Sequence, residues 1–241
     1  MYDRDLALIH DSGFGDYPTK SAPAILKMLA KVVTPGELVV ELGCGSGLIC
    51  RRLVKAGYDA YGLDIAPAMI QIARRKAPGA RFAVGSAYDA KIPKCAAVIS
   101  VGECLNYISG GGNHRRDLMA LFGRVHRSLK PGGLFIFDLA TPGQVPPGLA
   151  VTVFAEGPDW FILAAKQEDP KSGVLTRRII TFVKTGAAYR RSEEIHLQAL
   201  YPSTETAEQL RRIGFSVRTS RKYGEFQLPT KRVAFVARKH P

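Results

Sequence analysis

The chain has 241 residues, of which 46% are hydrophobic, and it carries a formal net charge of +13. This length suits one sizeable domain with an inserted lobe, and no run approaches the roughly 18 apolar residues that cross a bilayer. The charged N-terminus lacks the apolar stretch of a secretory signal, and the four cysteines form no C-x-x-C pair. We therefore expect a cytoplasmic protein with reduced thiols and no membrane partner.

The positive charge is spread along the chain. Residues 1–150 hold 18 lysines and arginines against 12 acids, and residues 151–241 hold 16 against 9. Nucleic-acid-binding proteins usually gather basic and aromatic side chains into one stripe. The composition favours a solvated basic surface and leaves a nucleic-acid partner as the weaker alternative.

Short apolar runs alternate with helical patterns through the first 140 residues. Strands are expected at 37–42, 59–64, 80–85, 96–101 and 134–139. Helical spacing lies between them, with Pro67 just inside one helix start and an apolar repeat of three and four through 118–129. This alternation predicts a parallel sheet with helices on both faces.

The pattern changes after residue 141. A linker rich in proline and glycine precedes four strands without helices, expected at 151–156, 160–167, 174–184 and 189–200. Such a run predicts an antiparallel insertion. Ser203 is expected to cap a last helix that ends at Gly214, and two strands, 215–220 and 233–237, complete the sheet.

The most informative stretch is Glu41-Leu-Gly43-Cys44-Gly45-Ser-Gly47, which leaves the first strand and opens a helix. Glycines let the backbone turn sharply and approach a ligand closely, and the helix start presents free N–H groups. The spacing is G-x-G-x-G, whereas dinucleotide-binding loops usually read G-x-G-x-x-G. The acid at Glu41 would repel a pyrophosphate and attract a sulfonium or an ammonium group.

These residues, with Asp64 and the Leu-Lys-Pro-Gly-Gly turn at 129–133, resemble the class I S-adenosylmethionine-dependent methyltransferases. The resemblance implies an α/β fold with a Rossmann-like, mostly parallel seven-stranded sheet, helices on both faces and an antiparallel β insertion before the last helix. It also implies S-adenosyl-L-methionine as the cofactor. The expected organisation is an N-terminal lid or arm at 1–30, a cofactor-binding domain at 31–141 and 201–241, and an insertion covering the active site at 142–200.

The resemblance also implies a set of cofactor contacts. The glycine loop would line the methionine and sulfonium end, Asp64 would hold the ribose hydroxyls and Ile65 would lie against adenine. A helix cap is the alternative role for Asp64. Where the family places an acid beside adenine, this chain has Ser86. The expected cofactor-binding residues are Glu41, Gly43, Cys44, Gly45, Gly47, Asp64, Ile65, Ser86, Ala87, Ser100 and Gly102.

The substrate side follows the fourth strand, because ligands bind beyond the carboxyl ends of parallel strands. Glu103, Asn106 and Tyr107 are candidate pocket residues there. Tyr17 joins them from the N-terminal segment, where Tyr2 and Phe14 would complete an aromatic lid. A surface-docked arm is the alternative for that segment.

Glu194 and His196 alternate along the last insertion strand and therefore share a face. We expect His196 to act as a general base, with Glu194 orienting it and Tyr201 nearby. An equally weighted alternative is that this strand face is simply exposed to solvent. His10 is a weaker candidate, and the histidine spacing predicts no metal site.

The sequence thus predicts in-line methyl transfer to a nitrogen or oxygen of a small molecule. An RNA- or protein-directed methyltransferase and a non-catalytic adenosylmethionine-binding module are the alternatives, and a dinucleotide oxidoreductase is a remote one.

Overall fold

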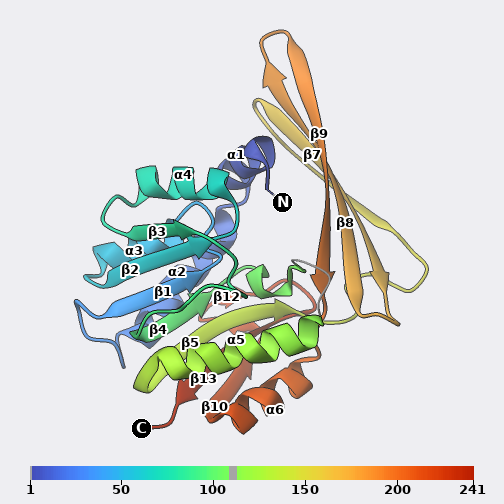
Figure 1. The fold of residues 1–241 in the computed structure, drawn as a ribbon. Helices are drawn as coiled ribbons and strands as arrows, with labels where there is room; N and C mark the ends of the chain where they lie inside the picture. Colours follow the sequence, from blue (N-terminus) through green and yellow to red (C-terminus); the bar gives the residue numbers. More distant parts are fainter. Residues whose placement is uncertain (1, 109–112) are drawn as a thin grey trace.

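The computed structural model describes residues 2–108 and 113–241. A seven-stranded sheet with helices on both faces forms the body, and a four-stranded antiparallel sheet stands above one end of it (Figure 1). A two-stranded hairpin completes the strands of the described chain. None of the helices in these two ranges is both long and apolar enough to cross a membrane.

The central sheet has the strand order β10-β13-β5-β4-β1-β2-β3. Its strands are β1 (Leu38–Leu42), β2 (Asp59–Asp64), β3 (Arg81–Val84), β4 (Cys95–Ser100), β5 (Leu129–Ala140), β10 (Phe215–Ser220) and β13 (Arg232–Lys239). Strands β1 to β5 pair in parallel, β13 pairs antiparallel with β5, and β10 pairs antiparallel with β13 at the edge of the sheet. The chain order reverses between β1 and β4, so a crevice is expected beyond the carboxyl ends of these two strands.

Alternate residues of the buried strands pack against different helices. Val39 belongs to a core cluster with Ile25 and Ile49, whereas Val40 belongs to a second cluster with Leu121 and Leu210. The helices are α2 (Asp16–Leu29), α3 (Leu48–Lys55) and α4 (Pro67–Lys76) on the first face and α5 (His114–Ser128) and α6 (Ser203–Ile213) on the second. This two-sided burial explains why the strands are almost uninterrupted apolar runs.

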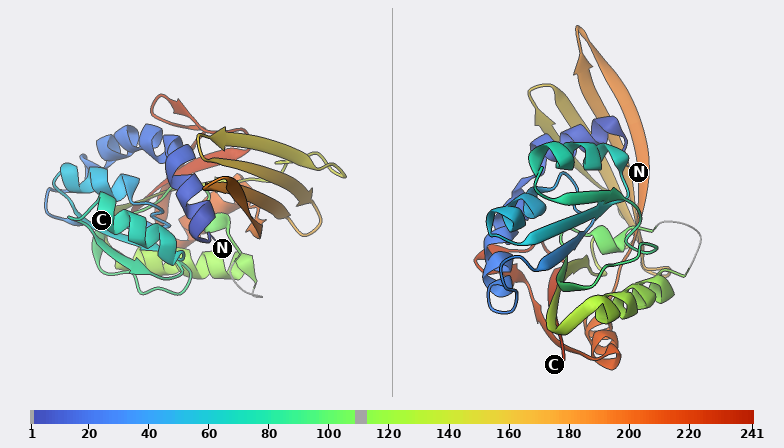
Figure 2. Two further views of the ribbon diagram at one scale, coloured as in Figure 1. Left: turned by 90° about the horizontal axis from the view of Figure 1, so that it is seen from above. Right: turned by 60° about the vertical axis from the view of Figure 1, so that its left-hand side comes forward.

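The insertion is a continuous antiparallel meander in the order β6-β7-β8-β9. Its strands are β6 (Val151–Gly157), β7 (Trp160–Asp169), β8 (Val174–Thr185) and β9 (Ala188–Ala199). Helix α1 (Arg4–Gly13) lies beside this sheet in both views of Figure 2. Its Leu6 and Ile9 pack with Ile162 and Ile179 of the sheet, and Ala7 packs with Met69 of α4.

The structure confirms the predicted fold class and corrects some local expectations. Helix α6 begins at Ser203 itself, and Pro202 is its N-cap without a side-chain cap bond, so Ser203 does not cap it. The sequence reading gave no helices in 1–30, where α1 and α2 form. It also missed the 3₁₀ turn Cys104–Asn106 and the hairpin of β11 (Lys222–Tyr223) and β12 (Phe226–Gln227).

Candidate active site

A cavity of about 340 Å³ lies where the carboxyl ends of the parallel strands face α1 and the insertion sheet. Twelve of the residues predicted for the site line it: Tyr17, Glu41, Gly43, Cys44, Gly45, Asp64, Ile65, Ser86, Ala87, Gly102, Glu103 and Tyr107. The cavity therefore brings together predicted residues that lie up to 90 positions apart in the sequence, from Tyr17 of α2 to Tyr107.

The glycine loop borders this cavity with a backbone that only glycine adopts readily. Gly43, Gly45 and Gly47 have φ values of 69°, 51° and 77°, all in the left-handed region. A Cβ on Gly43 would overlap the Cys104 side chain. No described atom lies within 4 Å of a Cβ built on Gly45, so this part of the loop faces open space.

Asp64 ends β2 beside the loop and is nearly buried. Its Oδ2 accepts from the Gly45 N–H at 2.8 Å and its Oδ1 from the Ala66 N–H at 2.9 Å. Helix α4 has Ala66 as N-cap, so Asp64 does not cap it. Burial raises the pKa of Asp64. Each carboxylate oxygen keeps a further lone pair that can accept from a ligand hydroxyl.

Glu41 lies under the loop at the start of α3. Its Oε2 accepts from the Cys50 N–H at 3.0 Å and from the Cys50 Sγ–H at 2.9 Å. Burial raises the pKa of Glu41 to about 8, against these two hydrogen bonds, which lower it. The carboxyl group thus satisfies one of the free N–H groups of the helix start and changes charge near neutral pH.

The far end of the cavity offers an apolar surface beside short polar groups. Ile65 is 41% exposed and lines the cavity. The Ser86 Oγ accepts from the Tyr88 N–H at 3.1 Å, and its own hydroxyl proton is not donated to any described residue. A buried carboxylate, an open glycine backbone and an apolar shelf together fit a nucleoside that carries a positive sulfonium.

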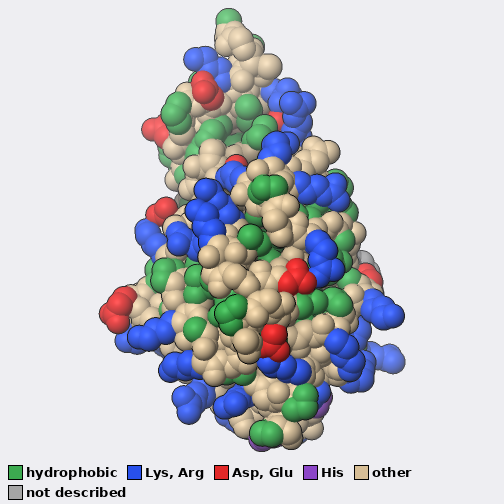
Figure 3. All heavy atoms as spheres, turned by 90° about the vertical axis from the view of Figure 1, so that its left-hand side faces the viewer, with side chains coloured by type: hydrophobic (Ala, Val, Ile, Leu, Met, Phe, Trp, Pro, Cys, Tyr) green, Lys and Arg blue, Asp and Glu red, His purple; other side chains and the backbone are tan. Residues whose placement is uncertain are grey.

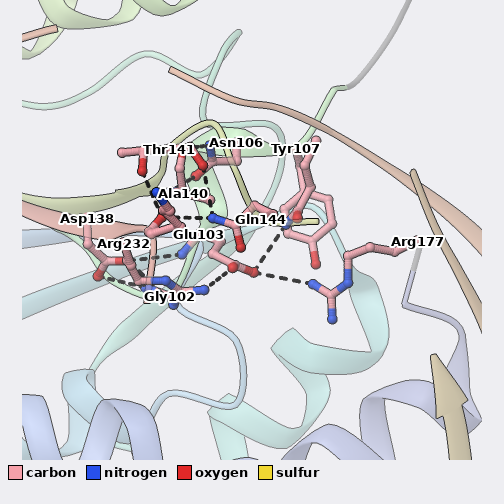
Figure 4. A network of polar contacts seen from close by, with 12 residues as sticks. Gly102, Glu103, Asn106, Tyr107, Asp138, Ala140, Thr141, Gln144, Arg177 and Arg232 are labelled. Atoms are coloured by element: carbon pink, nitrogen blue, oxygen red, sulfur yellow. Dashed lines mark hydrogen bonds and ion pairs between the residues drawn. The ribbon is translucent and has the colours of Figure 1, made fainter. Parts of the chain in front are cut away.

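Glu103 begins the opposite wall and is held in a network of charges (Figure 4). Its φ is 68°, a strained value for a residue with a Cβ. The carboxylate pairs with Arg232 and, at 3.3 Å, with the Arg177 Nη1. Burial raises the pKa of Glu103, but the two arginines outweigh it and the net shift is downward. The N–H groups of Gly102 and Glu103 donate to Asp138, which Arg232 also approaches.

The N-terminal segment closes the cavity above this network. The Glu194 carboxylate accepts from the backbone N–H groups of Tyr2 at 2.7 Å and Asp3 at 2.9 Å. Tyr2 lines the cavity, and its hydroxyl lies 3.2 Å from that of Tyr107. Glu194 therefore fixes the position of Tyr2 from the insertion sheet.

His196 and Glu194 form the predicted pair, with His196 Nε2 2.8 Å from Glu194 Oε2. Burial raises the pKa of Glu194, but hydrogen bonds from His196 and the Asp3 N–H lower it to about 2. His196 is 1% exposed, and its ring centroid lies 5.3 Å from that of Tyr2 and 5.5 Å from that of Tyr107. Neither member of the pair lines the cavity, since the two tyrosines stand between them and it.

Four other predicted residues also lie outside the cavity wall. The Asn106 amide is satisfied by the backbone of Ala140 and Ala199, so it joins β5 to β9 instead of facing a ligand. Tyr201 faces a separate, smaller cavity, and its hydroxyl donates to the His114 carbonyl, away from His196.

Gly47 and Ser100 have packing roles. A Cβ on Gly47 would lie 3.0 Å from the Ala73 Cβ, so this glycine allows α3 and α4 to approach. The Ser100 Oγ donates to the Leu42 carbonyl and ties β4 to β1. The backbone that reaches the cavity after β4 belongs to Val101 and Gly102.

The sequence reading underrated His10 and missed Arg177 and Arg232, which all line the cavity. Burial lowers the pKa of His10 to about 4. The sequence pattern could have indicated the position of Arg177. It alternates with Leu175 and Ile179, whose buried side chains lie on the same face of the strand. No cluster of three or more metal-binding side chains occurs in residues 2–108 and 113–241.

Comparison with known proteins finds similarity to methyltransferases. Residues 39–133, from β1 to the turn within β5, match the family described as "Methyltransferase domain". YqeM of Bacillus subtilis (strain 168), whose name assigns it to the methyltransferases, is 26% identical over 189 residues, covering 74% of this chain and 73% of YqeM.

Two solved structures share nearly the whole fold. An S-adenosylmethionine-dependent methyltransferase from Clostridium acetobutylicum superposes with a TM-score of 0.80 at 20% identity, covering 98% of each chain. The sugar N-methyltransferase KedS8 from Streptoalloteichus superposes with a TM-score of 0.77 at 17% identity, covering 97% of this chain and 92% of KedS8. Residues 39–133 therefore carry a methyltransferase domain, and the chain has the class I, Rossmann-like fold of the S-adenosylmethionine-dependent methyltransferases that it resembles.

Proposed function

We propose that the chain methylates a nitrogen or oxygen nucleophile of a small molecule held between the glycine loop and the insertion sheet. One observation carries this proposal: the cavity that begins at the loop is closed on its other side by α1, the insertion and the segment after β4. Such an enclosed wall suits a small acceptor, and the similarity to a sugar N-methyltransferase supports it.

The cofactor would occupy the loop side of this cavity. Asp64 would accept the ribose hydroxyls, Gly43 and Gly45 would present backbone to the amino-acid end, and Ile65 with Ala87 would flank adenine. S-adenosylmethionine supplies an already activated methyl group, so the chain's own task is to align the acceptor and exclude water. The insertion and α1 provide that enclosure.

The residues opposite the loop would handle the acceptor. Tyr2, Tyr107 and Glu103 present polar atoms, and His10 presents a ring that burial keeps neutral above about pH 4. His10 lines the cavity and the enclosed His196 does not, so by position His10 is the better placed general base, although burial makes it a weak one. We assign His196 and Glu194 to positioning Tyr2.

The cofactor assignment is tested by replacing the ribose-facing carboxylate. Asp64→Ala should weaken the binding of S-adenosylhomocysteine by about 1–3 kcal/mol, because hydrogen bonds to a charged group are lost. Isothermal titration calorimetry measures this change. Asp59→Ala, at the other end of the same strand in an exposed ion pair with Arg81, is the matched control and should bind as the wild type does.

Circular dichroism would verify that both variants remain folded. Unchanged affinity in folded Asp64→Ala would refute the ribose assignment, and a protein that methylates no small amine, phenol or carboxylic acid would refute the acceptor class.

A further inference from the structure

Arg177 reaches the cavity with hydrogen-bond donors that the described residues do not use. Its Nη1 donates to Glu103, and Figure 4 shows the remaining nitrogens of the guanidinium directed away from that carboxylate. The Nε atom is buried, and none of the described residues accepts its hydrogen. A buried donor without a partner costs free energy, which a ligand that accepts from it would recover.

The free edge of this guanidinium has a definite shape. With Nη1 engaged by Glu103, the Nε and Nη2 groups remain, and these two N–H bonds point in parallel. A carboxylate matches this pair with its two oxygens, and the resulting bidentate contact is among the strongest in proteins. A neutral amide or hydroxyl would satisfy only part of it.

Two phenols beside Arg177 extend the same recognition. The hydroxyls of Tyr2 and Tyr107 lie 3.2 Å apart, and both side chains line the cavity with Arg177. In a pair of hydroxyls one donates to the other, so one O–H remains available for a ligand oxygen. Burial raises the pKa of Tyr107, so its hydroxyl keeps its proton.

The local charge also leaves room for an anion. Lys166 on β7 lies directly opposite Arg177 on β8 in the strand register, so the two side chains share the inner face of the sheet. No acidic residue within the described chain forms an ion pair with Lys166. Burial, then the like charge of Arg177, lowers the pKa of Lys166. The acids Glu103 and Asp138 thus face three cations, Lys166, Arg177 and Arg232.

The guanidinium is held in place before any ligand arrives. Glu103 Oε2, which accepts from Arg177, also accepts from Gln198 Nε2 at 3.2 Å, and its other oxygen pairs with Arg232. Ile179, two residues along β8 on the same face, is 3% exposed and lines the cavity. A charged donor on a rigid strand amid apolar walls is typical of a residue that selects a ligand.

We propose that Arg177 selects methyl acceptors that carry a carboxylate, which it binds through its Nε and Nη2 groups with help from the Tyr2–Tyr107 hydroxyls. This proposal rests on the proposed function, since it names the acceptor class of the same cavity. Arg177 then anchors the acceptor at a distance from the reacting atom and acts as a specificity residue.

The test uses full-length protein saturated with S-adenosylhomocysteine and labelled with ¹⁵N-arginine. Benzoate and hexanoate are titrated against the wild type, with benzamide and hexanamide as uncharged partners of the same shape. We expect the Nε–Hε resonance of Arg177 to shift saturably with the carboxylates and to stay in place with the amides. Arg177→Lys, which keeps the charge beside Glu103, should weaken carboxylate binding at least tenfold by calorimetry.

Arg178→Gln is the matched control, because Arg178 points to the opposite face of β8 and pairs with Glu193. Carboxylate binding should not change in it. Equal binding of carboxylate and amide by the wild type, or full carboxylate binding by folded Arg177→Lys, would overturn the proposal. S-adenosylhomocysteine affinity is measured on the same samples, so a failure of cofactor binding is seen separately, and the amide comparison can be repeated without the cofactor.

Discussion

A single buried carboxyl group, Glu41, couples the glycine loop to helix α3. It accepts from the backbone and the thiol of Cys50, and burial raises its pKa to about 8. Because an acid in an unfolded chain has a pKa near 4.5, the folded protein binds the proton more tightly between these two values. Stability contributed by the protonated group is therefore lost as the pH rises from about 4.5 to 8.

Glu41→Gln should remove this dependence. The free energy of unfolding of the variant, measured relative to wild type by urea denaturation, should rise between pH 5 and pH 8. The rise cannot exceed about 1.4 kcal/mol per pH unit, the value for one proton. Glutamine can still accept from the Cys50 N–H, so the loop should keep its form.

Glu37→Gln is the matched control at the start of the same strand region. A hydrogen bond from Lys130 lowers the pKa of Glu37, so its contribution to stability is gained below the pH range of the Glu41 effect, and the difference should be nearly flat as the pH rises to 8. A flat difference for Glu41→Gln would contradict the protonation assigned to Glu41.

At the scale of single residues, the sequence predicted which residues meet at the cavity where the backbone itself forms the wall, and their binding roles stay predictions. Gly43, Gly45 and Asp64 follow from a strand–loop–strand spacing, so their meeting needs no knowledge of distant packing. Asn106 and His196 could not be placed in this way, because what covers them, β5 with β9 for one and Tyr2 for the other, comes from remote parts of the chain.

Helix α1 packs between the insertion sheet and helix α4 of the central domain. Its Leu6 and Ile9 pack on the insertion, its Ala7 on α4, and its Asp5 is fixed by two hydrogen bonds from Arg190, Nε to Oδ2 at 2.6 Å and Nη2 to Oδ1 at 2.5 Å. Hydrogen bonds from Arg190 lower the pKa of Asp5 against the effect of burial. This ion pair holds the N-terminal wall of the cavity against β9.

Arg190→Ala should loosen that wall. The carboxylate of Asp5, which is 4% exposed, would lose both bonds, so backbone amides of residues 4–13 should exchange hydrogen several-fold faster by mass spectrometry. Arg191→Ala, whose arginine pairs with Glu193 on the other face of β9, should leave exchange in α1 unchanged. Equal exchange in α1 for both variants would show that the Asp5–Arg190 pair does not hold the helix.

Helices and strands whose apolar residues repeat at a regular spacing were predictable from the sequence. Those whose spacing is interrupted were not. The strands of both sheets show apolar runs or alternation, and α6 ends at Gly214 with φ 111°, as its glycine indicated. Helix α2 contains Pro18 and Pro23 and follows Gly15, so helix breakers hide its pattern. The role of 1–30 as a closing lid stays a prediction, and Met1 lies outside the described residues.

At the scale of the whole molecule, the face shown in Figure 3 has no single site around which the positive charge gathers. Lysine and arginine side chains are distributed over the entire face shown in Figure 3, with acidic side chains among them. This face lacks the continuous basic stripe that nucleic-acid binding would favour. The spread charge agrees with a solvated surface and with general attraction of anionic small molecules.

The architecture concentrates its chemistry at one end of the central sheet. The carboxyl ends of β1, β2 and β4 supply the glycine loop, Asp64 and Glu103, while β8 and α1 supply Arg177 and His10 from above. One side of the cavity is therefore built by the central sheet and the loops that follow its strands, and the other side by α1 and the insertion sheet. A cofactor on the first side and an acceptor on the second is the arrangement that we propose.

A crystal structure of the protein with S-adenosylhomocysteine would test this arrangement most directly. We expect both ribose hydroxyls to lie within hydrogen-bonding distance of the Asp64 carboxylate and the sulfur to face the part of the cavity lined by Tyr2, Tyr107 and Arg177. Binding of the nucleoside away from Asp64, or a sulfur that points away from that part of the cavity, would contradict this arrangement.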